Sequence, residues 1–134
     1  MLGALNYLNL HNICHRDIKL ENIMLMNDAD LSNLRLIDFG LSRNVEKTSN
    51  MKSLCSGTPF YIAPEVLNRH VTVASDIWSL GVVMYVCLCG KLPFSGHNTD
   101  EIFKSILWKE INIFKDPRLK HISEESKDLL NHLL

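Results

Sequence analysis

Four polar side chains fall within six residues near the start of the chain. Asp17 supplies a carboxylate, Lys19 an ammonium group and Asn22 a carboxamide, with Glu21 lying between the last two. The apolar run 23–26 follows at once, so the polar loop enters a segment that a folded protein tends to bury. This arrangement predicts polar groups held on a rigid base and facing a cleft. For these residues alone, a charged surface turn before a strand is the alternative.

Three motifs occur in a fixed order along the chain. HRDIKLEN at 15–22 contains the polar loop, DFG at 38–40 follows the apolar run 34–37, and APE lies at 63–65. The first has the pattern H-R-D-x-K-x-x-N of a kinase catalytic loop. An isolated DFG is a weak signal, whereas three motifs in this order and at these separations are specific. The chain therefore resembles a eukaryotic-type protein kinase over essentially its whole length.

The resemblance implies an α+β fold that is mainly α-helical, namely the large lobe of a protein kinase. A short two-stranded β-hairpin, 23–26 with 34–37, would lie at the active site, and 38–65 would be the activation segment. A glycine-rich loop, a Val-Ala-x-Lys strand and a glutamate-bearing helix precede the catalytic loop in the family, and these 134 residues contain none of them. We therefore expect a partial kinase domain, 1–134, truncated at both ends and without the small N-terminal lobe.

Roles for the polar loop follow from the resemblance. Phosphoryl transfer depends mainly on placing the acceptor hydroxyl, the γ-phosphate of ATP and Mg²⁺ in line. By their positions in the motifs, Asp17 would accept or orient the hydroxyl proton and Lys19 would steady the γ-phosphate. Asn22 and Asp38 would bind Mg²⁺, a hard cation that takes oxygen ligands.

Other residues match the remaining parts of a kinase nucleotide site. Met24 and Ile37 match positions that floor the adenine pocket, although both would also suit an ordinary core. The backbone of Glu21 would face the ribose. His15 and Phe39 resemble a pair that packs beneath the site, where a buried and hydrogen-bonded histidine is the default interpretation.

Supporting residues follow from the same comparison. Asp76 resembles a helix residue that hydrogen-bonds the catalytic-loop backbone. Glu65 resembles a residue that pairs with an arginine, and that arginine would lie further toward the C-terminus than this chain extends. Arg16 resembles the residue that pairs with a phosphate on the activation segment of kinases regulated in that way. The candidate phosphate acceptors are Thr48, Ser49, Ser53 and Ser56.

The substrate class follows from two features. Lys19 and the stretch GTPFYIAPE at 57–65 resemble serine/threonine kinases, so ATP and a protein with a Ser or Thr acceptor are the expected partners. The stretches 76–82 and 89–94 look most like calcium/calmodulin-regulated kinases, with the calcium-dependent kinases that carry their own EF-hands as the nearest type. A calcium-sensor module outside this chain would fit. Leu20 departs from the family, where proline is commonest at this position.

The sequence suggests two alternative functions. The first is a non-catalytic binding module that docks substrates or a partner kinase, because these residues would hold ATP from one side only and we expect them to be inactive alone. The second is calcium binding by the loop that begins at Asp28, which has Asp30 and Ser32 at alternate positions. That loop has Asn33 where an EF-hand needs glycine and Phe39 where it needs a bidentate glutamate, so we exclude it.

Composition limits the partners. The formal net charge is −1 and the charges are mixed in sign, so nothing favours nucleic acid or an anionic membrane surface. The longest apolar run, 80–89, is too short to cross a bilayer and suits a buried helix, and no secretory signal begins the chain. The four cysteines lie in apolar surroundings without metal-binding spacing, which predicts reduced thiols in an intracellular, cytoplasmic protein.

Helices should surround the hairpin. Helices are predicted at 1–11, at 73–89 with Gly90 as its C-terminal cap, from Asn98 onward, and from Ser123 onward. The second half of 73–89 is apolar all round, which predicts burial on every side. The expected buried stripes of the other helices are Met1, Ala4, Leu5 and Leu8; Ile102, Phe103, Ile106 and Leu107; and Leu129, Leu130, Leu133 and Leu134.

Overall fold

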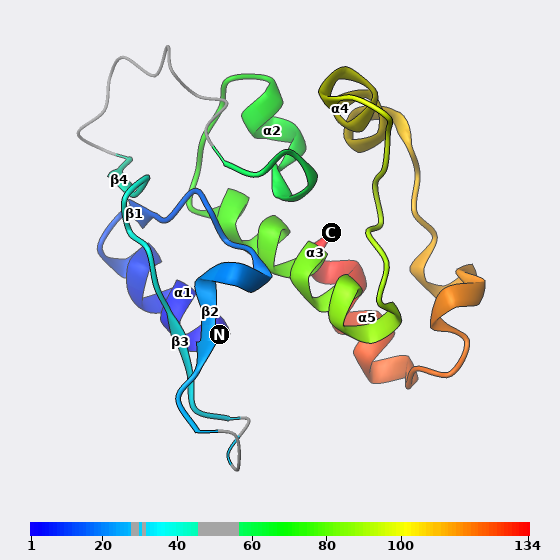
Figure 1. Ribbon diagram of the computed structural model, residues 1–134, viewed down its shortest axis with the longest axis horizontal. Helices are drawn as coiled ribbons and strands as arrows, with labels where there is room; N and C mark the ends of the chain where they lie inside the picture. Colours follow the sequence, from blue (N-terminus) through cyan, green and yellow to red (C-terminus); the bar gives the residue numbers. More distant parts are fainter. Residues whose placement is uncertain (28–29, 31, 46–56) are drawn as a thin grey trace.

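A computed structural model describes residues 1–27, 30, 32–45 and 57–134. Its helices are α1 (Leu2–Leu10), α2 (Pro64–Leu67), α3 (Ala74–Cys89), α4 (Thr99–Trp108) and α5 (Glu124–Leu133), and its strands are β1 (Ile13–Cys14), β2 (Ile23–Leu25), β3 (Leu34–Leu36) and β4 (Arg43–Asn44). Helix α3 crosses the middle of the molecule, with α1 and the strands toward one end and α4 and α5 toward the other (Figure 1). Among the described residues, no helix has both the length and the apolarity needed to span a membrane.

The strands form two small antiparallel sheets. Strand β1 pairs with β4, and β2 pairs with β3 as the predicted hairpin, with Ile23 opposite Leu36. These two side chains pack beside a core cluster that Leu5 and Leu8 of α1 form with Leu80 of α3 and its neighbours. The predicted helix and hairpin are therefore confirmed, and both contribute to the cluster that contains Leu80 of α3. Ala4, predicted on the buried stripe of α1, is exposed, because the stripe that reaches α3 is narrower than expected.

Helix α3 ends as predicted at Gly90, whose φ of 67° is left-handed and whose N–H donates to the carbonyl of Val86. Its second half is not buried on every side. Tyr85 faces a cluster shared with α5 and is fully buried, whereas Cys87 points away from it and is exposed. The expected burial of the last turn of α3 and of the Cys87 thiol is wrong, because among the described residues the elements that pack on this turn cover the side of Tyr85 and leave Cys87 exposed.

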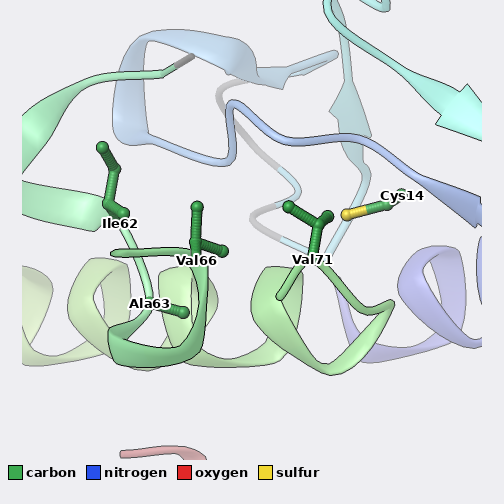
Figure 2. Close-up of a cluster of buried hydrophobic side chains, with 5 residues drawn as sticks. All are labelled: Cys14, Ile62, Ala63, Val66 and Val71. Carbon is green, nitrogen blue, oxygen red and sulfur yellow. The ribbon is translucent and has the colours of Figure 1, made fainter. Parts of the chain in front are cut away.

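A second cluster joins β1 to the segment that leads into α3. Figure 2 shows its five buried side chains, and they are Cys14, Ile62, Ala63, Val66 and Val71. The thiol of Cys14 is fully buried and lies 3.4 Å from the carbonyl oxygen of Thr72. Burial raises the pKa of this thiol well above its usual range, so the sulfur acts as an apolar core atom rather than a nucleophile.

The predicted N-terminal caps of α4 and α5 are present. The Asn98 side chain accepts a hydrogen bond from the Glu101 N–H at 2.9 Å, and Ser123 accepts one from Ser126 at 3.3 Å. The predicted stripes are too wide at one edge, because Leu107 and Leu129 are about 40% exposed. The other residues of the two stripes face the core. Ile102 and Ile106 of α4 and Leu130 and Leu133 of α5 are buried.

A polar clamp fixes the far end of α3. The hydroxyl of Tyr85 donates to Oδ2 of Asp116 at 2.5 Å, and the Arg118 guanidinium donates to both oxygens of that carboxylate at 2.7–2.9 Å. The guanidinium also lies 5.1 Å from the centre of the Tyr85 ring. The hydrogen bonds and charge of Arg118, together with Tyr85, hold the pKa of Asp116 well below its usual range, against the effect of burial.

This clamp predicts an acid-sensitive contribution to stability. Replacing Asp116 by Asn should lower the free energy of unfolding at pH 7 by about 1.5–3 kcal/mol, the range for hydrogen bonds to charged groups. Because the folded-state pKa of Asp116 is depressed, its contribution is complete above the unfolded value of about 3.9 and is lost as the pH falls through the lower folded value. Urea unfolding of both proteins from pH 7 to pH 3 should show the difference shrinking. A difference that stays constant across this range would contradict the assignment.

Candidate active site

The loop at 15–22 is tied to the first turns of α3 by one carboxylate. Asp76 is 3% exposed, and its two oxygens accept hydrogen bonds from the backbone N–H groups of His15 at 2.6 Å and Arg16 at 2.9 Å. Burial raises the pKa of Asp76, whereas these N–H groups act in the opposite sense. The predicted link between Asp76 and the loop backbone is confirmed. Arg16 takes a left-handed φ of 72° within this turn.

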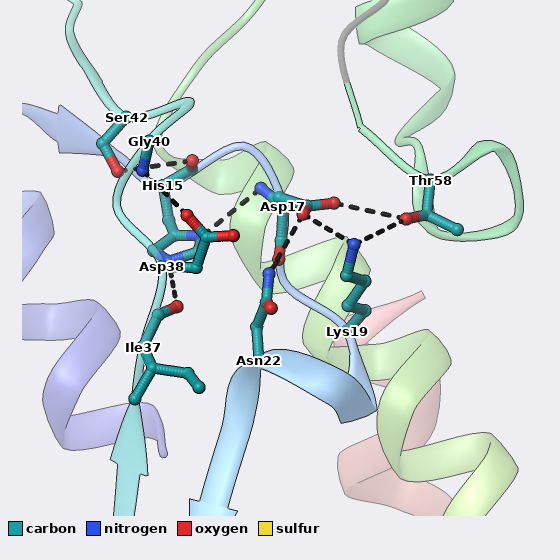
Figure 3. A network of polar contacts seen from close by, with 9 residues as sticks. All are labelled: His15, Asp17, Lys19, Asn22, Ile37, Asp38, Gly40, Ser42 and Thr58. Atoms are coloured by element: carbon teal, nitrogen blue, oxygen red, sulfur yellow. Dashed lines mark hydrogen bonds and ion pairs between the residues drawn. The ribbon is translucent and has the colours of Figure 1, made fainter.

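Asp17 is the centre of a hydrogen-bonded cluster (Figure 3). The Asn22 amide nitrogen donates to the Asp17 backbone oxygen at 2.8 Å and to Oδ2 at 3.0 Å, and the Lys19 ammonium lies 2.8 Å from the same Oδ2. The Thr58 hydroxyl bridges the pair, because it donates to Asp17 Oδ1 at 3.3 Å and accepts from Lys19 at 3.1 Å. The structure thus brings together three residues of the predicted site and adds Thr58.

The cluster keeps its two opposite charges at neutral pH. Burial alone would raise the pKa of Asp17, but the hydrogen bond and charge of Lys19, with Asn22 and Thr58, hold it below the usual value. The pKa of Lys19 is raised by its hydrogen bond to Asp17, and the charges of Glu21 and Asp38 add to this effect. Asp17 is therefore an ionised carboxylate that can accept a hydrogen bond from a bound hydroxyl.

Thr58 reaches the cluster because of the glycine before it. Gly57 has φ 121°, and a Cβ atom there would lie 2.9 Å from the backbone oxygen of Arg16. Glycine therefore lets the chain pass close over the loop and turn Thr58 inward, at the start of the 3₁₀ helix η2 (Pro59–Tyr61). In the sequence, Thr58 is one residue of the motif at 57–65 and carries no predicted role of its own. A polar residue after a glycine in this motif was the available signal.

Asp38 approaches the cluster through the end of β3. The N–H of Ile37 donates to the carbonyl of Asn22 at 2.9 Å, which extends the β2–β3 pairing by one step. Asp38 follows with a left-handed φ of 63°, and its Oδ1 accepts from the N–H of Gly40 at 3.1 Å. Asp38 is exposed. Its carboxylate is therefore held by its own turn and faces solvent beside the loop.

His15 packs beneath these residues as predicted. Its Nδ1 accepts from the N–H of Asp17 at 3.3 Å, so the proton lies on Nε2, which donates to the carbonyl of Ile37 at 3.2 Å. Its ring meets that of Phe39 edge to face, with centroids 4.8 Å apart. The predicted pairing and the buried, hydrogen-bonded histidine are confirmed, and His15 joins the loop to the turn that carries Asp38.

Strand alternation places Met24 and Ile37 on one face of the hairpin. Ile23 and Leu36 are opposite each other and face the core, so their neighbours in the chain point the other way. Met24 is 47% exposed and Ile37 is half-buried. Arg35 lies opposite Met24 and shares this face, so the hairpin presents both apolar and charged side chains beside the polar cluster.

The donor set suits a hard cation. Because the amide nitrogen of Asn22 is used in the bonds to Asp17, its amide oxygen is the atom that could bind a metal, together with the carboxylate of Asp38. Two oxygen ligands fit Mg²⁺, which keeps several waters and also binds substrate phosphates. Within the described part of the chain, no group of three or more His, Cys, Asp or Glu residues could form an all-protein metal site.

Two further expectations concern the segment after Asp38. Glu65, whose expected arginine lies outside this chain, accepts a hydrogen bond from the Ser75 hydroxyl at 2.8 Å, a partner that no motif in the sequence indicated. The guanidinium of Arg16 donates to the carbonyl of Leu41 at 3.5 Å. The candidate phosphate acceptors of this segment, Thr48, Ser49, Ser53 and Ser56, lie outside the described residues.

The close approach at Gly57 predicts a specific destabilisation. Replacing Gly57 by Ala should lower the free energy of unfolding by about 1–3 kcal/mol because of backbone strain, and by more if the Arg16 carbonyl must move. Replacing Gly3 by Ala is the matched control, since a Cβ there meets nothing within 4 Å and the residue lies in α1. That control should stabilise by roughly 0.5–1 kcal/mol. Equal urea midpoints for the two variants would show that Gly57 is not under constraint.

Comparisons with protein families and with curated proteins both match this chain to protein kinases. The protein kinase domain model matches residues 1–134. Calcium-dependent protein kinase 25 of Arabidopsis thaliana is 41% identical over 134 residues, which cover 100% of this chain and 25% of that protein. Calcium-dependent protein kinase 5 of Plasmodium falciparum (isolate 3D7) is 41% identical over 130 residues, covering 97% and 22%. Calcium-dependent protein kinase 3 of Plasmodium berghei (strain Anka) is 40% identical, covering 100% and 24%. The chain thus spans about a quarter of the length of these curated relatives.

Proposed function

The chain belongs to the protein kinase family, and we propose that it is the large-lobe portion of a serine/threonine kinase. In this proposal the enzyme transfers the γ-phosphate of ATP to a Ser or Thr hydroxyl of a protein substrate. The observation that carries the proposal is the cluster in which Asp17 lies within hydrogen-bond distance of Lys19, Asn22 and Thr58. An ionised carboxylate beside an ammonium group suits a reaction whose acceptor is a hydroxyl and whose donor is an anion.

Each residue of the cluster then has a part in the reaction. Asp17 accepts a hydrogen bond from the substrate hydroxyl and so orients the attacking oxygen. The Asp17 carboxylate then receives the proton of that hydroxyl. Lys19, already fixed by Asp17 and Thr58, donates to the γ-phosphate and offsets the charge that develops on it. Mg²⁺ held by Asn22 and Asp38 would neutralise charge on the phosphates. Asn22 also fixes Asp17 through two hydrogen bonds, so the carboxylate is oriented before substrate arrives.

One face of the hairpin is proposed to contact the adenine ring through its two apolar side chains. Met24 and Ile37 share that face, next to the polar cluster, and Met24 is nearly half exposed. The backbone of Glu21, in the 3₁₀ helix η1 (Leu20–Asn22), is proposed to face the ribose. ATP would then lie with its base on the hairpin and its phosphates toward Lys19 and Asp38.

The regulatory class is proposed from the relatives. Several are named calcium-dependent protein kinases, so we propose an intracellular kinase controlled by calcium through a sensor module outside residues 1–134. The stretches 76–82 and 89–94 support the same group by resemblance. Nothing in residues 1–134 is assigned to bind calcium itself.

The assignment of Asp17 predicts a large kinetic effect in the native polypeptide that contains this chain. Replacing Asp17 by Asn should lower kcat by ~10²–10⁴, the range for loss of a general base. Replacing Asp128 by Asn is the control, because Asp128 is an exposed carboxylate on α5, away from the cluster. Initial rates with ATP and a serine-containing peptide provide the measurement. A change within a few-fold for the Asp17 variant would refute its role.

Residues 1–134 alone are proposed to transfer little or no phosphate. They include no glycine-rich loop, so ATP would be held from one face, and the Met24 and Phe39 side chains are about half exposed. A radiometric assay with the isolated 134-residue chain should give a signal close to background. Stoichiometric phosphorylation of a peptide by this chain, abolished by Asp38→Ala, would overturn the proposal.

A further inference from the structure

Three buried polar side chains at the start of α3 each hold a different segment. Asp76 binds the backbone of the loop at 15–16, as described above. Ser75 donates to Glu65 at 2.8 Å, and the Ser79 hydroxyl lies 2.7 Å from the carbonyl oxygen of Tyr61. Ser75 and Ser79 are both at least nine-tenths buried. The helix that anchors the loop therefore also anchors the segment that brings Thr58 to it.

The hydrogen bond of Ser79 joins two elements. A serine inside a helix often donates to the carbonyl four residues earlier, and here Ser75 O lies 3.1 Å away. A hydroxyl has one proton, and the Tyr61 oxygen is closer at 2.7 Å. The stronger bond is therefore the one between α3 and η2, with the helix carbonyl as a secondary contact.

A single 3₁₀ turn connects Tyr61 to Thr58. The N–H of Tyr61 donates to the carbonyl of Thr58 at 3.0 Å, which closes the 3₁₀ turn, and Pro59 restricts the backbone at its first position. The Tyr61 side chain packs against core clusters on both sides of α3. A constraint on the Tyr61 carbonyl is therefore transmitted over one rigid turn to Thr58.

We propose that Ser79 is a positioning residue for phosphoryl transfer. Its hydroxyl holds η2 in the position at which the Thr58 hydroxyl is within hydrogen-bond distance of both Asp17 and Lys19. Ser79 itself touches neither substrate nor nucleotide. The kinetic part of this inference rests on the proposed kinase function, whereas the structural part concerns only the placement of η2.

The test uses the native polypeptide and two matched variants of α3. Ser79→Ala removes the hydroxyl that holds η2, and Tyr85→Phe removes another buried hydroxyl from the same helix, within the clamp to Asp116. Both should lower the melting temperature. Only Ser79→Ala should speed amide hydrogen exchange at 57–62 and lower kcat, by about 3- to 10-fold, with little change in KM for ATP. Ser79→Thr, which keeps the hydroxyl, should restore kcat.

A double-mutant cycle with Thr58→Val tests the route through Thr58. If Ser79 acts by placing the Thr58 hydroxyl, Ser79→Ala should lower kcat by less than twofold in the Thr58→Val background. Unchanged hydrogen exchange at 57–62, or losses of kcat that multiply in the double variant, would overturn the inference. Faster exchange at 57–62 in a protein whose unsubstituted form phosphorylates no serine or threonine peptide would instead refute the proposed function and leave the placement of η2 by Ser79 standing.

Discussion

The site depends on a buried carboxylate, Asp76, whose two oxygens accept hydrogen bonds from backbone N–H groups of the polar loop. Removing an ionised carboxylate from water is costly unless its oxygens are hydrogen-bonded, and the N–H groups of His15 and Arg16 supply those bonds to Asp76. The loop needs α3 for its shape, and α3 needs the loop to satisfy its buried charge. The polar loop and the central helix therefore supply each other's hydrogen-bond partners.

Hydrogen bonds from the polar loop hold the remaining parts of the site. Asn22 joins the loop to Asp17 through its side chain and to β3 through its backbone, so the hairpin is held in register with the polar cluster. His15 makes the second connection to β3 through the carbonyl of Ile37. Residues far apart in the sequence are therefore fixed by hydrogen bonds of ordinary length. Flexible side chains such as Lys19 are constrained by partners on two different segments.

Features fixed by nearby residues could be predicted from the sequence. The hairpin, the end of α3 at Gly90 and the caps at Asn98 and Ser123 depend on residue types within a few positions, and all are confirmed. The motif at 15–22 also predicted the residues that meet around Asp17, because the loop itself brings them together. Their roles in catalysis stay predictions.

Features fixed by distant residues could not be predicted in the same way. The contacts of Thr58 with Asp17 and of Ser75 with Glu65 depend on how separate segments of the chain pack against one another. No local sequence pattern records that packing. The exposure of Cys87 has the same cause, since a uniformly apolar sequence does not reveal which side of a helix is left uncovered. Burial of such a stretch is set by its neighbours in space.

The anchoring of the loop by α3 also sets the order in which the protein can be built. Asp76 is 61 residues from His15 in the chain, so the bond between them closes a long loop and carries a large entropic cost. During synthesis the segment at 15–22 leaves the ribosome long before Asp76 does, and it then lacks the acceptor that gives it its final shape. The link between the loop and α3 can therefore form only after Asp76 has been synthesised, and a chain that stops short of this helix lacks both of its hydrogen bonds.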